Sequence, residues 1–366
     1  MRWDTQEALL SAGRGTRVSW HSSARLVQVV CWPLLKLRRL FMPPASVADT
    51  VCNRLGQEVS MRSLRLAFAW AFATVFWFGF ITAAIIWVAR GGPLWGLAVL
   101  GLLAVGVSLA AERLLPYEQS WNRSHADRAR DVVHAVVNES LNAAGIATWV
   151  VLVGLVQTQA ARGLWPHSAP LWLQAIVALV LADLGITLAH LASHRYAPLW
   201  RLHAVHHSVT RMYGFNGLMK HPLHQMIEAS AGMAPLLLLG ISQQIAAVVA
   251  LAVVVQLLLQ HSNVDMRIGP LRHVFAFAPV HRFHHLRYGR SGDVNFGLFF
   301  SFWDRLLGTA FFVPTYRVRT PDLGIGQRPD SEGLPRAAAD ALYRGCDGNR
   351  AAGAAEASSS ACASFG

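Results

Sequence analysis

The chain has 366 residues, of which 54% are hydrophobic and only 14% are charged. A typical soluble domain has about 25% charged residues, so the composition excludes a disordered chain and argues against an ordinary soluble enzyme. Lys and Arg number 32 against 20 acidic residues, which gives a net charge of +12. Such an excess suits nucleic acid or an anionic membrane surface. The high hydropathy favours the membrane, and we expect no nucleic-acid partner.

Residues 1–65 are predicted to form a basic N-terminal leader, with ten Lys and Arg residues against four acidic ones. They lack the compact charged-then-apolar pattern of a signal peptide. Residues 27–40 are compatible with a basic amphipathic segment on the membrane surface. A solvated, partly disordered leader explains them equally well, and the sequence leaves both interpretations open.

Two uncharged runs, 66–89 and 93–111, are each long enough to cross a hydrocarbon layer of about 30 Å as a helix. The Arg-Gly-Gly-Pro sequence between them predicts a turn, so the two runs form a transmembrane hairpin. Runs 140–161 and 163–182, separated by Arg162, predict a second hairpin.

The fifth run, 229–260, is too long for one span and short for two, and a polar break interrupts it at 240–244. It predicts a short or re-entrant hairpin. The expected fold is therefore all-α: a polytopic membrane protein with about four transmembrane helices, this additional hairpin and a cytoplasmic histidine-rich cap.

Orientation follows from the short loops, because Lys and Arg are enriched on the cytoplasmic side. The two predicted outer turns carry only Arg90 and Arg162, whereas residues 113–130 carry four Arg residues. The pattern places the N-terminus and the histidine-bearing segments in the cytoplasm, in a bacterial inner membrane or an equivalent one. We expect a membrane domain over 66–316 and a disordered tail over 317–366, which is rich in small and polar residues.

Twelve of the sixteen histidines lie between positions 190 and 285, mostly in three clusters. These are HLASH at 190–194, HAVHH at 203–207 and HRFHH at 281–285. Spacings of three and four residues place imidazoles on one face of a helix. Alone, the first pair is more typical of an interfacial or internally bonded pair. Eight imidazoles in three clusters exceed what one first-row metal ion binds, so we expect two metals in a shared site.

The clusters can meet only if the run at 229–260 crosses the membrane an even number of times. A single span there would place the last cluster in the opposite compartment from the first two.

The three clusters, in this order, resemble the histidine boxes of the fatty acid hydroxylase and sterol desaturase superfamily of membrane non-haem di-iron enzymes. Further similarities are NGLMKHP at 216–222, QHSN at 260–263, NFG at 295–297 and FWDRLLGT at 302–309, so the resemblance covers roughly 112–309. It implies two iron ions held by His190, His194, His203, His206, His207, His281, His284 and His285. By position, His261 and His221 match family histidines that complete the coordination.

Several other residues are expected near the metals. Asp183 precedes His190 and His194 by 7 and 11 residues, so it shares their helical face and is expected to orient a ligand ring. A snorkelling acid at a helix end is the alternative. Asp293, Asn295 and Asp304 are candidates for hydrogen bonds to ligand rings, with ordinary turn and cap roles equally open. His224 and His273 are expected beside the ligand rings or on the surface. Trp165, Trp200 and Trp303 are expected to be interface anchors. Glu112 and Asp131 are expected either to form surface charge pairs or to match family positions.

The resemblance implies an oxygen-dependent enzyme that hydroxylates or desaturates a lipid, such as a sterol or a fatty acyl chain. The chain has no GxGxxG nucleotide motif and no cytochrome b5 haem motif. We therefore expect a separate electron donor, a ferredoxin or a cytochrome b5-like protein with its reductase. The alternative is a histidine-rich metal-binding or metal-transport membrane protein without redox catalysis.

Overall fold

The computed structural model describes residues 47–156, 164–287 and 292–325, and these contain α-helices and short 3-10 helices but no β-strand. The chain divides into two compact units, Met1–Phe68 and Ala69–Gly366. Of the predicted leader, residues 47–65 are helical, whereas 1–46, with the proposed amphipathic segment, lie outside the described residues.

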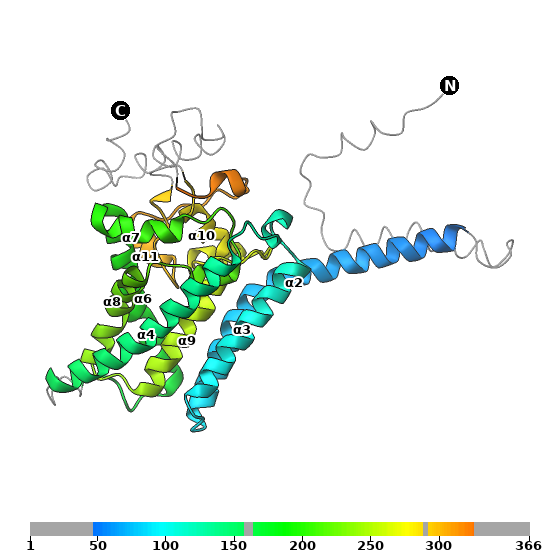
Figure 1. Cartoon of the computed structure of the whole chain (residues 1–366). Coiled ribbons are helices and arrows are strands. Elements are labelled where there is room, and N and C mark those ends of the chain that lie inside the picture. The colour runs from blue at the N-terminus through cyan, green and yellow to red at the C-terminus, as the bar shows by residue number, and fades with distance from the viewer. Residues whose placement is uncertain (1–46, 157–163, 288–291, 326–366) are drawn as a thin grey trace, which may run out of the picture. The chain divides into compact units, whose positions relative to one another are not determined.

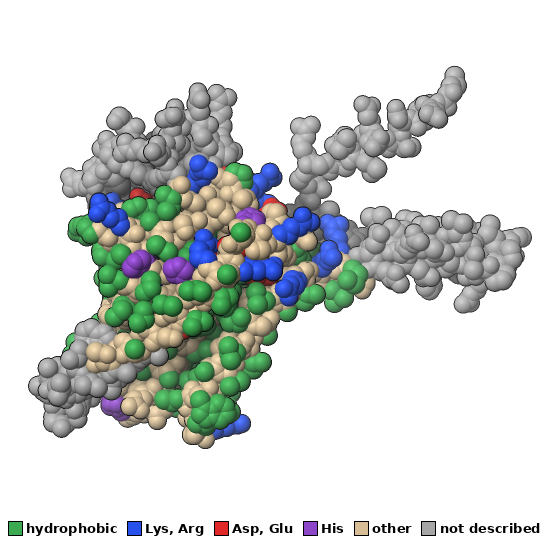
Figure 2. Space-filling model, viewed as in Figure 1, with side chains coloured by type: hydrophobic (Ala, Val, Ile, Leu, Met, Phe, Trp, Pro, Cys, Tyr) green, Lys and Arg blue, Asp and Glu red, His purple; other side chains and the backbone are tan. Residues whose placement is uncertain are grey.

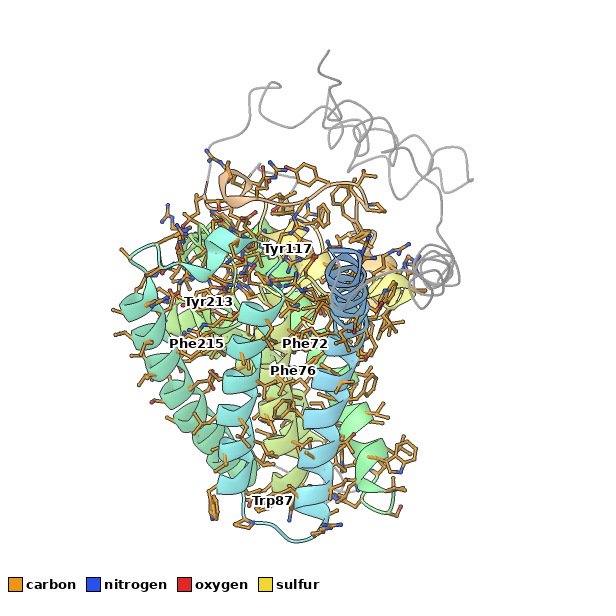
Figure 3. The ribbon with its side chains drawn as sticks, turned by 90° about the vertical axis from the view of Figure 1, so that its right-hand side faces the viewer. Phe72, Phe76, Trp87, Tyr117, Tyr213 and Phe215 are labelled. Atoms are coloured by element: carbon orange, nitrogen blue, oxygen red, sulfur yellow. The ribbon has the colours of Figure 1, made fainter. Side chains whose placement is uncertain are left out.

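The first predicted hairpin is confirmed by α2 (Val47–Ala89) and α3 (Trp95–Leu114), which contain candidate spans at Ser60–Ala89 and Trp95–Leu114. At its corner the Trp87 indole packs so closely that a Cβ on Gly92 would lie 2.5 Å from the ring. The indole Nε1 also donates a hydrogen bond to the Pro93 carbonyl at 2.9 Å. Figure 3 shows Trp87 at this corner, at the opposite end of the helices from Tyr117.

The second predicted hairpin needs a correction in its bounds. The run at 163–182 belongs to α6, which spans Leu171–Arg195. It begins later because Trp165 lies in a preceding turn, where its indole is 3% exposed and donates to Gln174 Oε1 at 2.8 Å. Trp165 is therefore buried and not an interface anchor. The helix continues past Asp183 because that carboxylate is fully buried and bonded.

The first arm of this hairpin lies in α4 (Arg128–Val156), which begins before the predicted run at 140–161. Residues 157–161 and most side chains at the end of α4 lie outside the described residues. Whether α4 crosses the membrane therefore remains a prediction.

The run at 229–260 forms the predicted hairpin, made of α8 (Pro222–Leu238) and α9 (Gln243–Gln260). Gly240 turns the chain with φ +90°, and Ser242 caps α9 by accepting a hydrogen bond from the Ile245 N–H at 3.3 Å. The polar break in the sequence is this turn. α9 is long and apolar enough to span a membrane, as are α2, α3 and α6, which makes four such helices among the described residues.

Within the second unit, a cap of short helices gathers at one end of α3, α4, α6, α8 and α9 (Figure 1). Figure 2 shows Lys and Arg side chains over this end and hydrophobic side chains along the helices. The four apolar helices make the chain an integral membrane protein. The cap contains α7 (Ala197–His207), η2 (Gln119–Asn122), η3 (Gly214–Leu218), η4 (Gly269–His273), α10 (Ala278–His284), α11 (Phe302–Leu307) and η6 (Thr320–Asp322).

The cap also includes the beginning of the predicted tail. Val318 and Leu323 are buried in a cluster with Trp121 and Phe283, while residues 326–366 lie outside the described part of the chain.

Close packing of α6 against α8 sets the position of the first histidine cluster. A Cβ on Gly185 would lie 2.1 Å from the Ala231 carbonyl oxygen, and one on Gly232 would lie 2.9 Å from the Ile186 side chain. The two helices therefore meet at their backbones. This contact holds the end of α6, which carries His190 and His194, beside the start of α8.

Candidate metal centre

Nine histidines converge in the cap, and they form two groups. Within each group the available nitrogens lie within 4.8 Å of one another. All nine rings are buried, including that of His194, whose side chain is only 2% exposed. The first group is His190, His194, His203, His207 and His284, and the second is His206, His261, His281 and His285.

Each HxxHH box serves both groups. On α7, His203 and His207 belong to the first group and His206 to the second. In the last box the assignment is reversed, because His284 belongs to the first group while His281 and His285 belong to the second. Residues i and i+4 are about 40° apart around a helix, whereas i+3 lies on the other side of i. The spacing therefore lets one helix present ligands to two adjacent sites.

Backbone carbonyls fix the tautomer of three rings. The Nδ1 atoms of His190, His206 and His284 lie 2.8, 3.0 and 2.7 Å from the carbonyl oxygens of Phe296, Met219 and Val294 respectively. A carbonyl only accepts hydrogen bonds, so each Nδ1 must carry the proton. The Nε2 atom of each ring is left with a lone pair.

Side chains fix two further rings. His194 Nδ1 donates to Asp293 Oδ1 at 2.8 Å. His261 Nδ1 lies 3.0 Å from Asn216 Oδ1, and the same oxygen accepts a hydrogen bond from the Tyr213 N–H. In the neutral form each ring therefore also has its lone pair on Nε2, and the Nε2 atom of His194 has no hydrogen-bond partner among the described residues.

These lone pairs face one another. His206 Nε2 and His261 Nε2 are 3.2 Å apart, with no proton available between two rings of this tautomer. Burial, reinforced by nearby positive charge, lowers the pKa of both rings well below the usual value, so neither takes up a second proton. Two opposed lone pairs at this distance repel each other unless a cation lies between them.

The donor set fits metal ions. Neutral imidazole suits Fe, Zn, Cu and Ni. With metal–nitrogen bonds of about 2.1 Å, adjacent ligands at right angles lie roughly 3.0 Å apart. The Nε2 atoms of His190 and His207 lie 2.9 and 3.0 Å from His203 Nε2, and His281 Nε2 lies 3.2 Å from His285 Nε2. These spacings match two imidazole-lined metal positions.

Asp183 contacts the backbone and not an imidazole. Its carboxylate has no solvent exposure and accepts hydrogen bonds from the N–H groups of Leu298, Phe299 and Phe300 at 2.9–3.0 Å. Asp304 holds the same segment by accepting from the N–H groups of Phe296 and Gly297. Because the Phe296 carbonyl fixes His190, both acids act on that ring through the 296–300 segment.

Two residues that were not predicted to belong to the site also bind this segment. Gln256 Nε2 donates to the Leu298 carbonyl at 2.8 Å, and Gln260 Nε2 donates to the carbonyls of Gly297 and Leu298 at 3.0 and 2.8 Å. The available signal was two glutamines four residues apart in an apolar run, since polar side chains within a membrane helix usually have partners.

Asn295 supports the site without touching a ligand ring. It has φ +56°, its amide donates to the carbonyls of Val280 and Phe311, and its Oδ1 accepts from the Phe311 N–H. These bonds tie the residue before His281 to the segment that carries the Val294 and Phe296 carbonyls.

The other histidine candidates differ in position. His221 lies outside both groups and caps α8, where its Nδ1 accepts from the Leu223 N–H at 3.2 Å. His224 is fully buried, 2.9 Å from Ser193 Oγ, and it forms a third potential ligand group with His203 and Glu228. His273 is exposed on η4.

The interpretation of Glu112 and Asp131 as surface charges is wrong. They are 2% and 0% exposed. Glu112 accepts hydrogen bonds from the N–H groups of Gly214 and Asn263 at 2.6 and 3.0 Å, and Asp131 accepts from the Tyr213 hydroxyl at 2.7 Å. Both acids hold the loop that contains Tyr213 and Phe215 in Figure 3 and positions Asn216 beside His261.

Trp200 also departs from its predicted role as an interface anchor. It is half-buried, and its ring centre lies 5.1 and 5.3 Å from the ring centres of His194 and His207. It covers one side of the first histidine group. Trp303 is likewise half-buried and packs against Phe302, with ring centres 4.6 Å apart.

Known proteins resemble this chain over the region that contains the histidine groups. The family model for fatty acid hydroxylase matches residues 175–309, which include both histidine groups. Ornithine lipid hydroxylase OlsE of Rhizobium tropici is 33% identical over 233 residues, or 62% of this chain and 70% of that protein. Alkylglycerol monooxygenase of Danio rerio is 29% identical over 138 residues, which cover 37% of this chain but only 30% of that protein. No solved structure matches the chain.

Proposed function

Because the chain belongs to the fatty acid hydroxylase family, an oxidoreductase family whose matched members act on lipid, we propose that it is a membrane di-iron oxygenase that hydroxylates a lipid. The proposal rests chiefly on the two adjacent groups of imidazoles, whose Nε2 lone pairs face inward. The first group would hold one iron and the second the other, with His203 and His206 on α7 linking them.

Bound iron would supply the activation of dioxygen that attack on an unactivated C–H bond requires. The chain's own contribution is positional. The carbonyls of Phe296, Met219 and Val294 hold the proton of three rings on Nδ1, which leaves Nε2 free for metal. Burial of the histidines keeps bulk water away from the reaction.

In the overall reaction, a lipid C–H bond, dioxygen, two electrons and two protons give a lipid alcohol and one water. The electrons need a reductant, and we propose a separate ferredoxin or a cytochrome b5-like protein with its reductase. An acidic donor would suit a chain with a net charge of +12.

The matched relatives favour hydroxylation over desaturation, because one is named a hydroxylase and the other a monooxygenase. The bacterial relative is named for ornithine lipid, so an ornithine-containing aminolipid is the first substrate to test. We place the catalytic domain at residues 66–325, which extends the expected 66–316 because Val318 and Leu323 pack in the cap. Its active site would face the cytoplasm of a bacterial inner membrane, which the single basic residue in the α2–α3 turn, Arg90, supports.

The test is to purify the full chain in detergent, measure its metal content and supply ornithine lipid, oxygen and a reduced ferredoxin. We expect two iron atoms per chain and a product 16 Da heavier than the substrate by mass spectrometry. The matched variants are His284→Ala, which removes a ring from the first group, and His125→Ala, which removes an exposed ring outside both groups. Stoichiometric zinc without turnover would instead support the metal-binding alternative.

A further inference from the structure

A cavity of about 260 Å³ lies beside α11, separate from both histidine groups. Its lining includes the basic side chains of Arg272, His273 and Arg305, and none of the described residues that line it is acidic. Such a lining gives the cavity a positive potential, and its volume exceeds that of a phosphate group. The cavity is therefore suited to an anion.

One buried polar group in the cavity lacks a partner. Ser301 lines it, is 3% exposed, and its Oγ has no hydrogen-bond partner among the described residues. Arg305 forms no ion pair in the same part of the chain, and Arg272 donates to the Gly269 carbonyl at 3.1 Å with one nitrogen, Nη1. A buried hydroxyl without a partner is costly unless a ligand satisfies it.

Two residues of the cavity lining, Arg272 and His273, belong to a segment, 267–275, that packs along the membrane helix α2. The Arg267 N–H bonds to the Ala69 carbonyl at 2.8 Å, and Phe275 packs on Trp77 with ring centres 5.2 Å apart. Between these contacts, Gly269 lies against the Trp70 ring. Residues 267–275 therefore lie along α2 for about 12 Å, within the candidate span Ser60–Ala89.

Side chains close to the cavity-lining residues are typical of a lipid interface. Trp70 is 48% exposed, as expected of an aromatic side chain at the level of the headgroups. Val274 and Leu306 are 43% and 74% exposed beside Arg272 and Arg305. Exposed apolar side chains adjacent to cations suit simultaneous contact with acyl chains and with anionic headgroups.

We propose that this cavity binds the phosphate group of a membrane phospholipid. Arg272 and Arg305 would contact the phosphate oxygens, because guanidinium groups bind phosphate in a bidentate manner. The Ser301 hydroxyl would donate a further hydrogen bond, while the acyl chains lie along Val274 and Leu306. Asn295 forms part of the cavity wall and precedes Phe296, whose carbonyl fixes His190, so the bound lipid would contact the segment that positions the metal centre.

Native mass spectrometry of the detergent-purified full chain tests this site with phosphatidylglycerol and with diacylglycerol, which lacks the phosphate. We expect phosphatidylglycerol to bind and diacylglycerol not to bind. The double variant Arg272→Gln with Arg305→Gln should weaken phosphatidylglycerol binding at least tenfold. The control double variant, Arg123→Gln with Arg128→Gln, changes two exposed arginines outside the cavity and should bind as the wild type does.

Ser301→Ala is the milder variant. It removes an unbonded hydroxyl, so the fold should be retained while lipid binding weakens several-fold. Inorganic phosphate at millimolar concentration separates the two sources of the ligand: retention of the lipid supports the proposal, whereas displacement of the lipid by phosphate overturns it in favour of a site for the free anion. Equal binding of diacylglycerol, or wild-type affinity in the Arg272 and Arg305 double variant, overturns the proposal.

Discussion

Replacement of Asp183 should show how far the metal site depends on the carboxylate that supports it. Asp183→Leu removes the acceptor of three buried N–H groups, those of Leu298, Phe299 and Phe300. Each orphaned buried donor costs about 1–3 kcal/mol, and loss of the carboxylate also removes its own desolvation cost. We therefore expect the variant to lose about 3–5 kcal/mol of unfolding free energy.

Asp183→Asn is a milder form of the same perturbation. Its amide oxygen can still accept from the N–H groups of Leu298 and Phe299, but its NH₂ group faces the Phe300 N–H, so one bond is lost. We expect a loss of about 1–3 kcal/mol. The order of stability should be wild type, then Asn, then Leu.

Thermal unfolding in detergent and iron content per chain measure these effects together. Both variants should also bind iron less tightly, because the Phe296 carbonyl no longer holds His190 firmly. Leu188→Ala is the matched control, since this side chain lies on the same helix and is 47% exposed. Unchanged unfolding temperature and full iron content in Asp183→Leu would show that the 296–300 segment does not depend on this carboxylate.

Four further outcomes can be measured on the same preparation. His206→Ala should abolish turnover while the protein still inserts into the membrane, and unchanged turnover would contradict the assignment of the second histidine group. Asp293→Asn should weaken iron affinity about tenfold because it removes the charged acceptor of His194 Nδ1, and equilibrium dialysis against a metal buffer checks this. Gly185→Val should lower the unfolding temperature by separating α6 from α8, whereas Gly79→Ala, where a Cβ meets nothing within 4 Å, should not. Removal of iron by a chelator should lower the unfolding temperature of the wild type, since a ligand bound only to the folded state stabilises it.

The fold could be predicted best where uncharged runs end at glycine. The α2–α3 corner at 90–93 and the α8–α9 turn at 240–244 were both recognised because Gly and polar residues interrupt long apolar stretches. The bounds of α6 could not be predicted in this way, because the charged Asp183 interrupts the uncharged run but not the helix. Asp183 is compatible with the helix interior because three distant N–H groups bond to it, and no local pattern reports such partners.

The ligands of the candidate site could be predicted from the sequence, but their division into two groups could not. The three histidine boxes identify eight rings, and a resemblance to known proteins added His261. The sequence does not show that HAVHH and HRFHH each contribute to both groups, because that depends on how α7 and α10 face each other. It also underestimated His224, whose burial against Ser193 follows from the close packing of α6 on α8.

The supports of the metal site come largely from the membrane helices. Asp183 on α6 and both Gln256 and Gln260 on α9 bond to the 296–300 segment, whose Phe296 carbonyl in turn fixes His190. These polar side chains are costly inside a bilayer unless they have partners, and the cap segment supplies those partners. The cap therefore supplies the hydrogen-bond partners of these polar side chains, and the helices hold the cap in position. The metal site and the membrane helices consequently form one cooperative unit. An internal deletion of α9 (Gln243–Gln260) should consequently prevent the site from forming.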